Sequence, residues 1–365
     1  MAKAPGRATR LHIDVPLLLL LLALTAFGLF VLYSASGQSM GAVIRQGRYF
    51  ALAYLIMFLG AQVSLQRFAR WAPWLYVLGV SLLLGVMFFG VGAKGAQRWL
   101  EMGGFRFQPS EVMKLAVPLA LAWYLSDRIL PPRLLYVLGA LALLGLPAGL
   151  ILLQPDLGTA LLIAASGLFV LYMAGIGWRY IFGALLLAIA SAWPAWVFVL
   201  KEYQKQRILT LLNPESDKLG AGWNIIQSKT AIGSGGWEGK GWMHGTQSQL
   251  DFLPESHTDF IIAVLAEEFG LKGVLLLLGI YLLILLRGFW IGVRAQTSFG
   301  RMMAGSLTLT FFVYIFVNMG MVAGLLPVVG VPLPLVSAGG TSVVTLMAGF
   351  GILMAISTEP RLVSR

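Results

Sequence analysis

The strongest constraint on the fold is a series of long apolar runs without a charged residue: Leu17–Leu32, Phe50–Val63, Leu75–Val91, Leu134–Leu153 and Val274–Leu286. A helix needs about 20 mostly apolar residues to cross a bilayer. Only 11% of the chain is charged, against roughly 25% in soluble domains. A cleaved signal peptide would explain the first run alone. The sequence therefore predicts an all-α polytopic membrane protein.

We expect ten membrane-spanning helices in a single integral membrane domain that covers residues 1–365. One large polar loop, about residues 201–257, separates the seventh helix from the eighth. An even number of helices places both termini on the same side of the membrane. The predicted spans are 15–33, 47–64, 74–92, 108–125, 134–153, 157–175, 178–200, 258–286, 300–323 and 340–357.

The basic residues of the short loops predict the orientation, because cytoplasmic loops carry an excess of Lys and Arg. The larger set lies on the side of the termini: Lys3, Arg7, Arg10, Arg67, Arg70, Arg128, Arg133, Arg179, Arg287, Arg294, Arg301, Arg361 and Arg365. The smaller set is Arg45, Arg48, Lys94, Arg98 and Arg106. Both termini are therefore expected in the cytoplasm and the large loop outside. This topology accounts for the net charge of +11 without a nucleic-acid partner.

The large loop is not a low-complexity segment. Residues Glu202–Leu212 have the pattern of a short amphipathic helix that ends at Asn213, before a proline. The pattern of residues Trp223–Ile232 predicts a second short helix. The next segment, Gly233–Gly245, is too rich in glycine for regular structure. A loop of this length between membrane helices is usually functional or disordered.

Two charges, Glu111 and Lys114, fall inside the predicted fourth helix and share one face of it. Charged side chains at membrane depth are costly and usually functional. The two residues either neutralise each other and fix helix packing, or line a cavity that a polar substrate enters. Asp156, at the start of the sixth helix, is more simply a helix N-cap.

The densest group of polar residues lies where the chain enters the eighth helix, between Asp251 and Phe260. Thr258 is expected to cap the helix, which would place Asp259 in the first turn, where the helix dipole favours a carboxylate. A merely structural Asp259 would not need Glu255 and His257 beside it. Glu267 lies on roughly the same face and would extend a polar track inward.

The last external loop, Gly324–Gly340, ends in Ser337, Gly339 and Gly340 ahead of the tenth helix. Paired glycines allow a ligand to approach the backbone closely. Free N–H groups at a helix start suit a phosphate or pyrophosphate. An ordinary re-entrant turn explains this segment equally well.

Together these segments resemble the shape, elongation, division and sporulation (SEDS) family, and its rod-shape members more than its cell-division members. The matching stretches follow the family order over nearly the whole chain, and the departures at Ser256 and Ala338 affect no ionisable group. The stretches are Gly95–Leu100, Phe107–Lys114, Leu153–Thr159, Gly222–Lys229, Ala231–Gly236, Gly239–Gly241, Gly245–Gln247, Phe252–Phe260 and Gly330–Ser342.

The resemblance implies a ten-helix peptidoglycan glycosyltransferase that polymerises lipid II into β-1,4 glycan strands during cell-wall elongation. It implies the bacterial cytoplasmic membrane, an extracytoplasmic active site and a class B penicillin-binding protein as partner. The family's catalytic carboxylate falls on Asp259, and its membrane acid–base pair falls on Glu111 and Lys114. Further substrate-binding or supporting residues are expected to be Arg48, Lys94, Arg98, Trp223, Gln227, Gln247, Glu255, His257, Ser337, Gly339 and Gly340.

In the expected reaction Asp259 acts as the general base, and external cations assist departure of the pyrophosphate. The sequence identifies no cofactor with certainty, but it leaves open a divalent cation such as Mg²⁺ or Mn²⁺ that would help the pyrophosphate leave, since Glu255, His257 and Asp259 are of the types that ligate one. The alternative function is a lipid II flippase. The absence of an internal repeat and the external clustering of polar residues argue against it, and the carboxylates argue against a non-catalytic scaffold.

Overall fold

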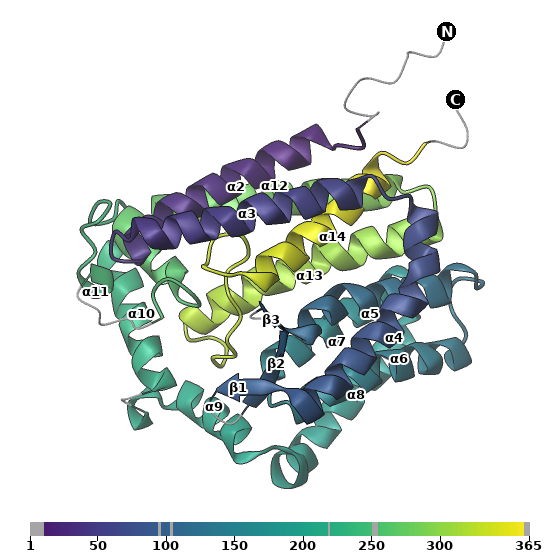
Figure 1. Cartoon of the computed structure of the whole chain (residues 1–365). Helices are drawn as coiled ribbons and strands as arrows, with labels where there is room; N and C mark the ends of the chain where they lie inside the picture. The colour runs from purple at the N-terminus through teal and green to yellow at the C-terminus, as the bar shows by residue number, and fades with distance from the viewer. Residues whose placement is uncertain (1–10, 94–95, 103–104, 218–219, 250–254, 361–365) are drawn as a thin grey trace.

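The computed structural model describes residues 11–93, 96–102, 105–217, 220–249 and 255–360. Each of the ten predicted spans has a helix among these described residues, as Figure 1 shows. The helices are α2 (Val15–Ala35), α3 (Met40–Ala61), α4 (Leu65–Phe89), α5 (Pro109–Ser126), α6 (Leu134–Leu153), α7 (Leu157–Met173), α8 (Trp178–Pro194), α12 (Ile261–Arg294), α13 (Ser298–Val322) and α14 (Thr341–Ser357).

Seven of the described helices are long and apolar enough to cross a membrane. The remaining three spans are the shorter apolar helices α7 and α14 and helix α5, which carries Glu111 and Lys114. The all-α polytopic prediction is confirmed, but several ends were misplaced. Helix α3 begins at Met40 and α4 at Leu65, because arginines near a helix end can extend to the interface and do not end the helix.

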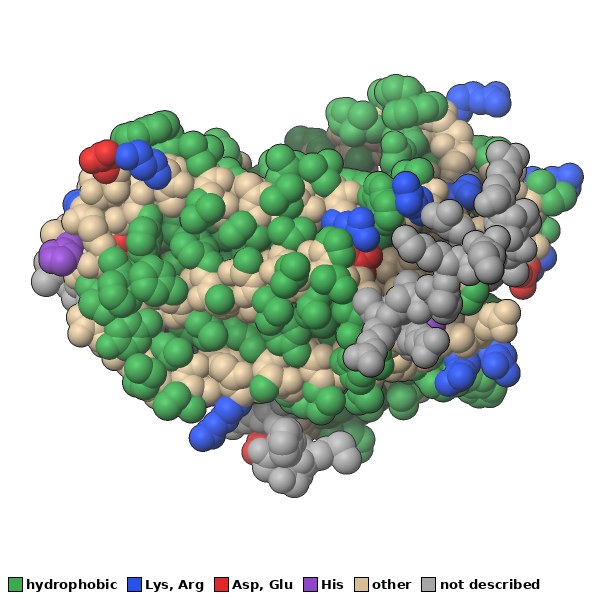
Figure 2. Space-filling model, turned by 90° about the horizontal axis from the view of Figure 1, so that it is seen from above, with side chains coloured by type: hydrophobic (Ala, Val, Ile, Leu, Met, Phe, Trp, Pro, Cys, Tyr) green, Lys and Arg blue, Asp and Glu red, His purple; other side chains and the backbone are tan. Residues whose placement is uncertain are grey.

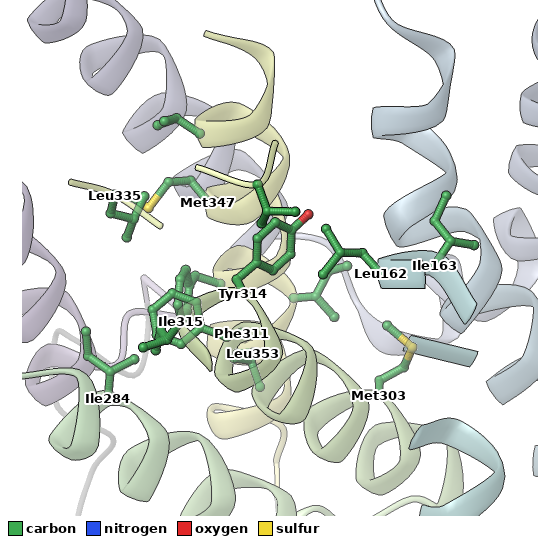
Figure 3. Close-up of a cluster of buried hydrophobic side chains, with 14 of the residues drawn as sticks. Leu162, Ile163, Ile284, Met303, Phe311, Tyr314, Ile315, Leu335, Met347 and Leu353 are labelled. Atoms are coloured by element: carbon green, nitrogen blue, oxygen red, sulfur yellow. The ribbon is translucent and has the colours of Figure 1, made fainter. Parts of the chain in front are cut away.

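Helix α13 lies at the centre of the bundle, against α5, α7, α12 and α14. Figure 3 shows the buried cluster there, in which Phe311, Tyr314 and Ile315 of α13 meet side chains of α7, α12 and α14. Close approach of α3 and α14 depends on Gly351, because a Cβ there would lie 2.6 Å from the carbonyl oxygen of Met57. Small residues at such contacts are typical of membrane helices.

The outer surface is apolar, as the bilayer requires. Figure 2 shows hydrophobic side chains over most of the face seen from above, with Lys and Arg mostly toward its edges. Helix α8, which continues into a π-helical segment at Ala195–Val199, contributes no buried residue. It therefore lies at the periphery of the bundle.

Both termini of the described chain lie at one end of the bundle, where His12 Nδ1 lies 3.0 Å from Thr358 Oγ1. The opposite end carries the large loop with α9 (Glu202–Leu212), a 3-10 turn at Pro214–Ser216, α10 (Ala221–Gly235) and α11 (Thr246–Gln249). The two short helices predicted in this loop are confirmed. Three short antiparallel strands that were not predicted follow α4, and the first includes the end of the span expected over 74–92: β1 (Val91–Ala93), β2 (Ala96–Met102) and β3 (Phe105–Phe107).

Helix α12 is not continuous, because Gly270 has non-helical angles of φ 64° and ψ −161°. The glycine-rich part of the large loop packs against this break. The amides of Lys240 and Gly241 donate to the carbonyls of Glu267 and Glu268, each at 3.0 Å. The glycines in this segment therefore permit a close contact between two stretches of backbone.

Candidate active site

The turn that precedes α12, residues Glu255–Phe260, carries the predicted catalytic carboxylate. Helix α12 begins after Phe260, its N-cap residue, and has no acidic residue in its first turn. The predicted capping role of Thr258 was therefore wrong. Its hydroxyl donates instead to the Glu255 carboxylate, 2.7 Å away. Asp259 consequently lies just outside the helix, in a turn whose geometry the neighbouring segments determine.

Three successive carbonyl groups of this turn accept hydrogen bonds from other elements. The Ala338 amide donates to His257 O at 2.9 Å, and the Ser337 hydroxyl donates to Thr258 O at 2.5 Å. The Asn318 side-chain amide of α13 donates to Asp259 O at 2.8 Å. The backbone of the turn is therefore held on both sides of Asp259. Ser337 supports this turn rather than a ligand.

The Asp259 carboxylate itself accepts no hydrogen bond from any residue that the structure describes. Its Oδ2 lies close to Gly330, where an added Cβ would be 3.6 Å away. Burial, and secondarily the negative charge of Glu255, raise the pKa of Asp259 to about 6. At neutral pH this group is mostly ionised, yet it binds a proton more readily than an ordinary aspartate.

Gly330, which lies close to the Asp259 carboxylate, is also part of the wall of a cavity of about 270 Å³ that we call the polar chamber; Asp259 itself does not line it. Side chains and backbone from β2, α5, α7, α13 and the last external loop line it. The lining residues are Arg98, Trp99, Gln108, Glu111, Lys114, Asp156, Thr159, Leu162, Tyr314, Gly330, Val331, Pro332, Gly339, Gly340, Thr341 and Ser342. A chamber with this lining is suited to a polar ligand.

The charged pair of α5 is buried and lines this chamber. Lys114 Nζ lies 2.7 Å from Glu111 Oε1 and 5.4 Å from the centre of the Tyr314 ring. The second carboxylate oxygen, Glu111 Oε2, has no hydrogen-bond partner among the described residues. Both interpretations of the pair are thus compatible with its position, since the two charges contact each other and also face the chamber.

Asp156 joins the start of α7 to the chamber wall. Its Oδ1 accepts from the Thr159 amide at 3.2 Å, which confirms the predicted N-cap. Its Oδ2 accepts from Gln108 Nε2 at 3.2 Å and lies 3.9 Å from Arg98 Nε. Arg98 also donates to the carbonyl of Pro155. The N-cap thus also positions an arginine at the chamber.

A second arginine, Arg207 of α9, lies near Arg98 and was not predicted as a site residue. Burial lowers the pKa of Arg207, and the charge of Arg98 lowers it further. The guanidinium group also stacks 5.9 Å from the Tyr203 ring centre. The amphipathic pattern of α9 indicated a polar face, but the sequence did not indicate what that face contacts.

An apolar groove of about 890 Å³ runs along α3, α4, α5 and α14. Three residues, Glu111, Gly340 and Thr341, line both this groove and the polar chamber. The two cavities therefore meet at the start of α14. The groove is lined by Tyr49, Leu52, Ile56, Leu59, Gly60, Val63, Phe68, Leu75, Phe107, Glu111, Val112, Leu115, Ala116, Leu119, Gly340, Thr341, Val344, Thr345, Ala348 and Ile352.

The paired glycines before α14 serve the protein's own contacts as well as the cavity. The Gly339 amide donates to Gln46 Oε1 at 3.1 Å. A Cβ on Gly340 would lie 3.1 Å from the Tyr49 ring. Helix α14 has no side-chain cap, and its first residues, Thr341 and Ser342, line the chamber. Its N-terminus therefore faces the chamber, where an anion is favoured.

The structure brings most, but not all, of the predicted site residues together. Arg98, Glu111, Lys114, Gly339 and Gly340 line the chamber, and Ser337, Glu255 and His257 belong to the contacts around Asp259. Within the described part of the chain, the lining of the chamber does not include Arg48, Trp223, Gln227 or Gln247. Lys94 lies outside the described residues.

The described residues do not gather ligands for a divalent cation. No group of three or more His, Cys, Asp or Glu side chains among them is placed to hold a metal ion. Glu255 is exposed and its carboxylate accepts from Thr258, so among the described residues near Asp259 the donor set falls short of the oxygen-rich shell that Mg²⁺ or Mn²⁺ prefers.

Comparison with known proteins assigns the family. Residues 15–362 match the model of the FtsW/RodA/SpoVE cell cycle proteins. The chain belongs to this family. It is 53% identical to the peptidoglycan glycosyltransferase MrdB of Escherichia coli (strain K12), over 100% of both chains. It is 38% identical to the probable peptidoglycan glycosyltransferase FtsW of Trichlorobacter lovleyi, over 96% of this chain and 94% of that one.

Solved structures agree with this assignment. A chain from a peptidoglycan synthase complex that coordinates polymerization and crosslinking has a TM-score of 0.83 at 32% identity, over 94% of this chain and 97% of that one. The rod shape determining protein RodA of Thermus thermophilus has a TM-score of 0.71 at 30% identity, over 94% and 96%. The SEDS resemblance is confirmed. The protein is a multi-pass membrane enzyme, a peptidoglycan glycosyltransferase.

Proposed function

We propose that this enzyme polymerises lipid II into β-1,4 glycan strands during cell-wall elongation, with Asp259 as the general base. The observation that carries the proposal is the junction of the apolar groove with the polar chamber at Glu111, Gly340 and Thr341. Lipid II has the same division, because its long polyprenyl tail is joined through a pyrophosphate to a sugar–peptide head. A site for this substrate needs both surfaces in contact.

The groove fits the tail, since its walls are apolar and it lies between membrane helices. The pyrophosphate would occupy the adjoining chamber, where positive charge is supplied by Lys114, Arg98 and the N-terminus of α14. Arg207, close to Arg98, adds a further cation at this end. Arginine forks and helix N-termini are the groups that bind phosphate oxygens best.

The reaction then needs a proton acceptor next to this chamber. The 4-hydroxyl oxygen of the acceptor sugar attacks the anomeric carbon of the donor, and its proton passes to the Asp259 carboxylate. The bond between the anomeric carbon and the pyrophosphate oxygen breaks, and polyprenyl pyrophosphate leaves. Attack opposite the α-linked leaving group gives the β-linked product. General base catalysis contributes typically 10²–10⁴-fold, and a pKa of about 6 suits that role.

We propose the cytoplasmic membrane as the location, with both termini in the cytoplasm and the active site outside. The excess of basic residues in the loops on the side of the termini supports this orientation. A class B penicillin-binding protein is the proposed partner. The similarity to a chain of a peptidoglycan synthase complex supports such a partner.

Purified protein with lipid II, in the presence of the partner, tests the proposal through the length of the glycan produced. Val112→Trp fills the groove and is expected to raise KM for lipid II by about tenfold or more, a loss of about 1.4 kcal/mol of binding. Leu138→Trp is the matched control, because Leu138 is exposed on α6, away from the groove. Translocation of lipid II without any polymer would reject the proposal in favour of a flippase.

A further inference from the structure

The buried asparagine of α13, Asn318, contacts the site without lining the polar chamber. Its side chain is fully buried, and its single amide nitrogen donates two hydrogen bonds. One reaches the carbonyl of Asp259 at 2.8 Å, and the other reaches the carbonyl of Val331 at 2.7 Å. The side chain thus connects the turn before α12 to the last external loop.

The orientation of this amide is determined by its surroundings. Both neighbouring groups are carbonyl oxygens, which only accept hydrogen bonds, so the NH₂ group must face them. The other end of the amide, Asn318 Oδ1, is buried and has no hydrogen-bond partner among the described residues. Such a group lowers stability. Placing an asparagine here therefore serves the two carbonyls and not the packing of α13.

The two carbonyls belong to the two segments that meet beside the Asp259 carboxylate, the turn before α12 and the Gly330–Val331 backbone. Val331 follows Gly330, and both residues line the chamber. Gly330 has a φ of +75°, and a Cβ there would lie 3.6 Å from Asp259 Oδ2. The same amide thus binds the residue that carries the carboxylate and the chamber-lining segment next to that carboxylate.

We propose that Asn318 is a positioning residue of the transferase reaction, which holds Asp259 and the Gly330–Val331 backbone at a fixed separation so that the carboxylate faces the chamber. The inference rests on the proposed role of Asp259 as the base. Asn318 does not touch the substrate. Its loss should therefore reduce turnover and leave the affinity for lipid II unchanged.

The test compares kcat and KM for glycan synthesis from lipid II, with partner supplied, at equal amounts of folded protein. Asn318→Leu keeps the approximate size and removes both donors. A misplacement of about 1 Å can cost about 10²-fold in rate, so we expect kcat to fall about 100-fold with KM unchanged. Thr310→Val is the matched control, because it removes a different buried polar group of α13, a hydroxyl without a hydrogen-bond partner among the described residues, and should keep the wild-type kcat.

A second variant acts on the same contact, between Gly330 and the Asp259 carboxylate, without changing α13. Gly330→Ala places a methyl group next to Asp259 Oδ2 and is expected to lower kcat by about 10²-fold as well. Gly324→Ala is its control, since Gly324 lies in the same loop with a φ of +69° but contacts the flexible end of Lys229. This pair decides the question if Asn318→Leu does not fold.

The outcomes separate this inference from the role of Asp259. Wild-type kcat in folded Asn318→Leu, or equal kcat in Gly330→Ala and Gly324→Ala, overturns the positioning role. A rise in KM alone assigns Asn318 to substrate binding and overturns it too. Asp259→Asn, measured alongside, must be inactive. If it is active, the proposed base is wrong; if it is inactive while both test variants keep kcat, only the positioning role is wrong.

Discussion

Two carboxylates on the same stretch of chain, Asp259 and Glu267, are treated by the fold in opposite ways. Glu267 is fully buried, and its Oε1 accepts from Lys240 Nζ at 2.7 Å, the Thr246 amide at 2.8 Å, the Thr246 hydroxyl at 3.1 Å and the Gln247 amide at 2.9 Å. Asp259 has its backbone held, whereas its carboxylate accepts no hydrogen bond from the described residues.

The difference separates a structural carboxylate from the proposed catalytic one. Glu267 receives donors from the glycine-rich loop and so fastens that loop to α12. Burial, together with the negative charge of Glu255, raises the pKa of Asp259 to about 6, and strongly perturbed carboxyl groups gather at functional sites. In the proposed function, loop attachment and proton transfer therefore fall to different residues of one segment.

The two residues of the pair Glu111–Lys114 contact each other and also line the chamber. Changes to this pair give the largest predicted effect. Glu111→Ala or Lys114→Ala leaves one buried charge uncompensated and should lower stability by about 3–5 kcal/mol. The double variant Glu111→Ala/Lys114→Ala should recover most of that stability but not glycan synthesis, because the pair lines the chamber. Unfolding in detergent and turnover per folded molecule measure the two effects.

The matched control for this pair is Asp14→Ala/Arg287→Ala, which removes an ion pair of 2.7 Å at the opposite end of the bundle. It should keep its turnover. If the double variant at positions 111 and 114 is as active as this control, the pair is structural, as Glu267 is. If both single variants match the wild type in stability and activity, neither interpretation of the pair holds.

Removal of the Glu267 side chain should affect stability more than chemistry. Glu267→Ala leaves Lys240 and two backbone amides of the loop without their acceptor. We expect a loss of about 2–3 kcal/mol, below the range for a fully buried pair, because Lys240 is partly exposed. Proteolysis of the loop and thermal unfolding measure this effect. A variant as stable as the wild type, yet inactive when folded, would contradict the structural role.

The smallest predicted effect is a shift in pH dependence. A base must be unprotonated, so kcat/KM should fall tenfold per pH unit below about 6, the pKa to which burial and Glu255 raise Asp259. Glu255→Gln removes the negative neighbour and lowers the pKa of Asp259, so the acidic fall in kcat/KM should move to lower pH by less than about one unit. Glu238→Gln, at an exposed carboxylate beside Lys272, should not move it. If kcat/KM falls at the same pH in both variants, the charge of Glu255 does not act on Asp259.

Features that depend on local sequence were predictable. Each of the ten predicted spans has a helix in the described structure, and the Asp156 cap followed from residue type and place. The ends of α3 and α4 were not, because arginines at the membrane interface do not mark loops. The motif that ends at Phe260 located Asp259, but its relation to α12 was wrong, since tertiary contacts from Ser337 and Ala338 determine the turn.

Features that depend on contacts between distant segments were not predictable. Asn318 lies in an apolar helix, where a single amide gives no sign of its two partners. Glu267 was expected to extend a polar track, but its carboxylate binds the glycine-rich loop instead. Nothing in the local sequence indicates that contact. The groove is formed by four helices far apart in sequence, so no local pattern contains it.

The most direct test of the account compares Asp259→Asn with Glu267→Gln for glycan length from lipid II and for thermal stability, with partner supplied. Asp259→Asn keeps the size of the side chain but cannot accept the proton. It should be as stable as the wild type, with turnover at least 10²-fold lower. Glu267→Gln should be less stable and should keep its turnover per folded molecule. Near-wild-type polymer from Asp259→Asn would contradict the proposal that this carboxylate is the catalytic base.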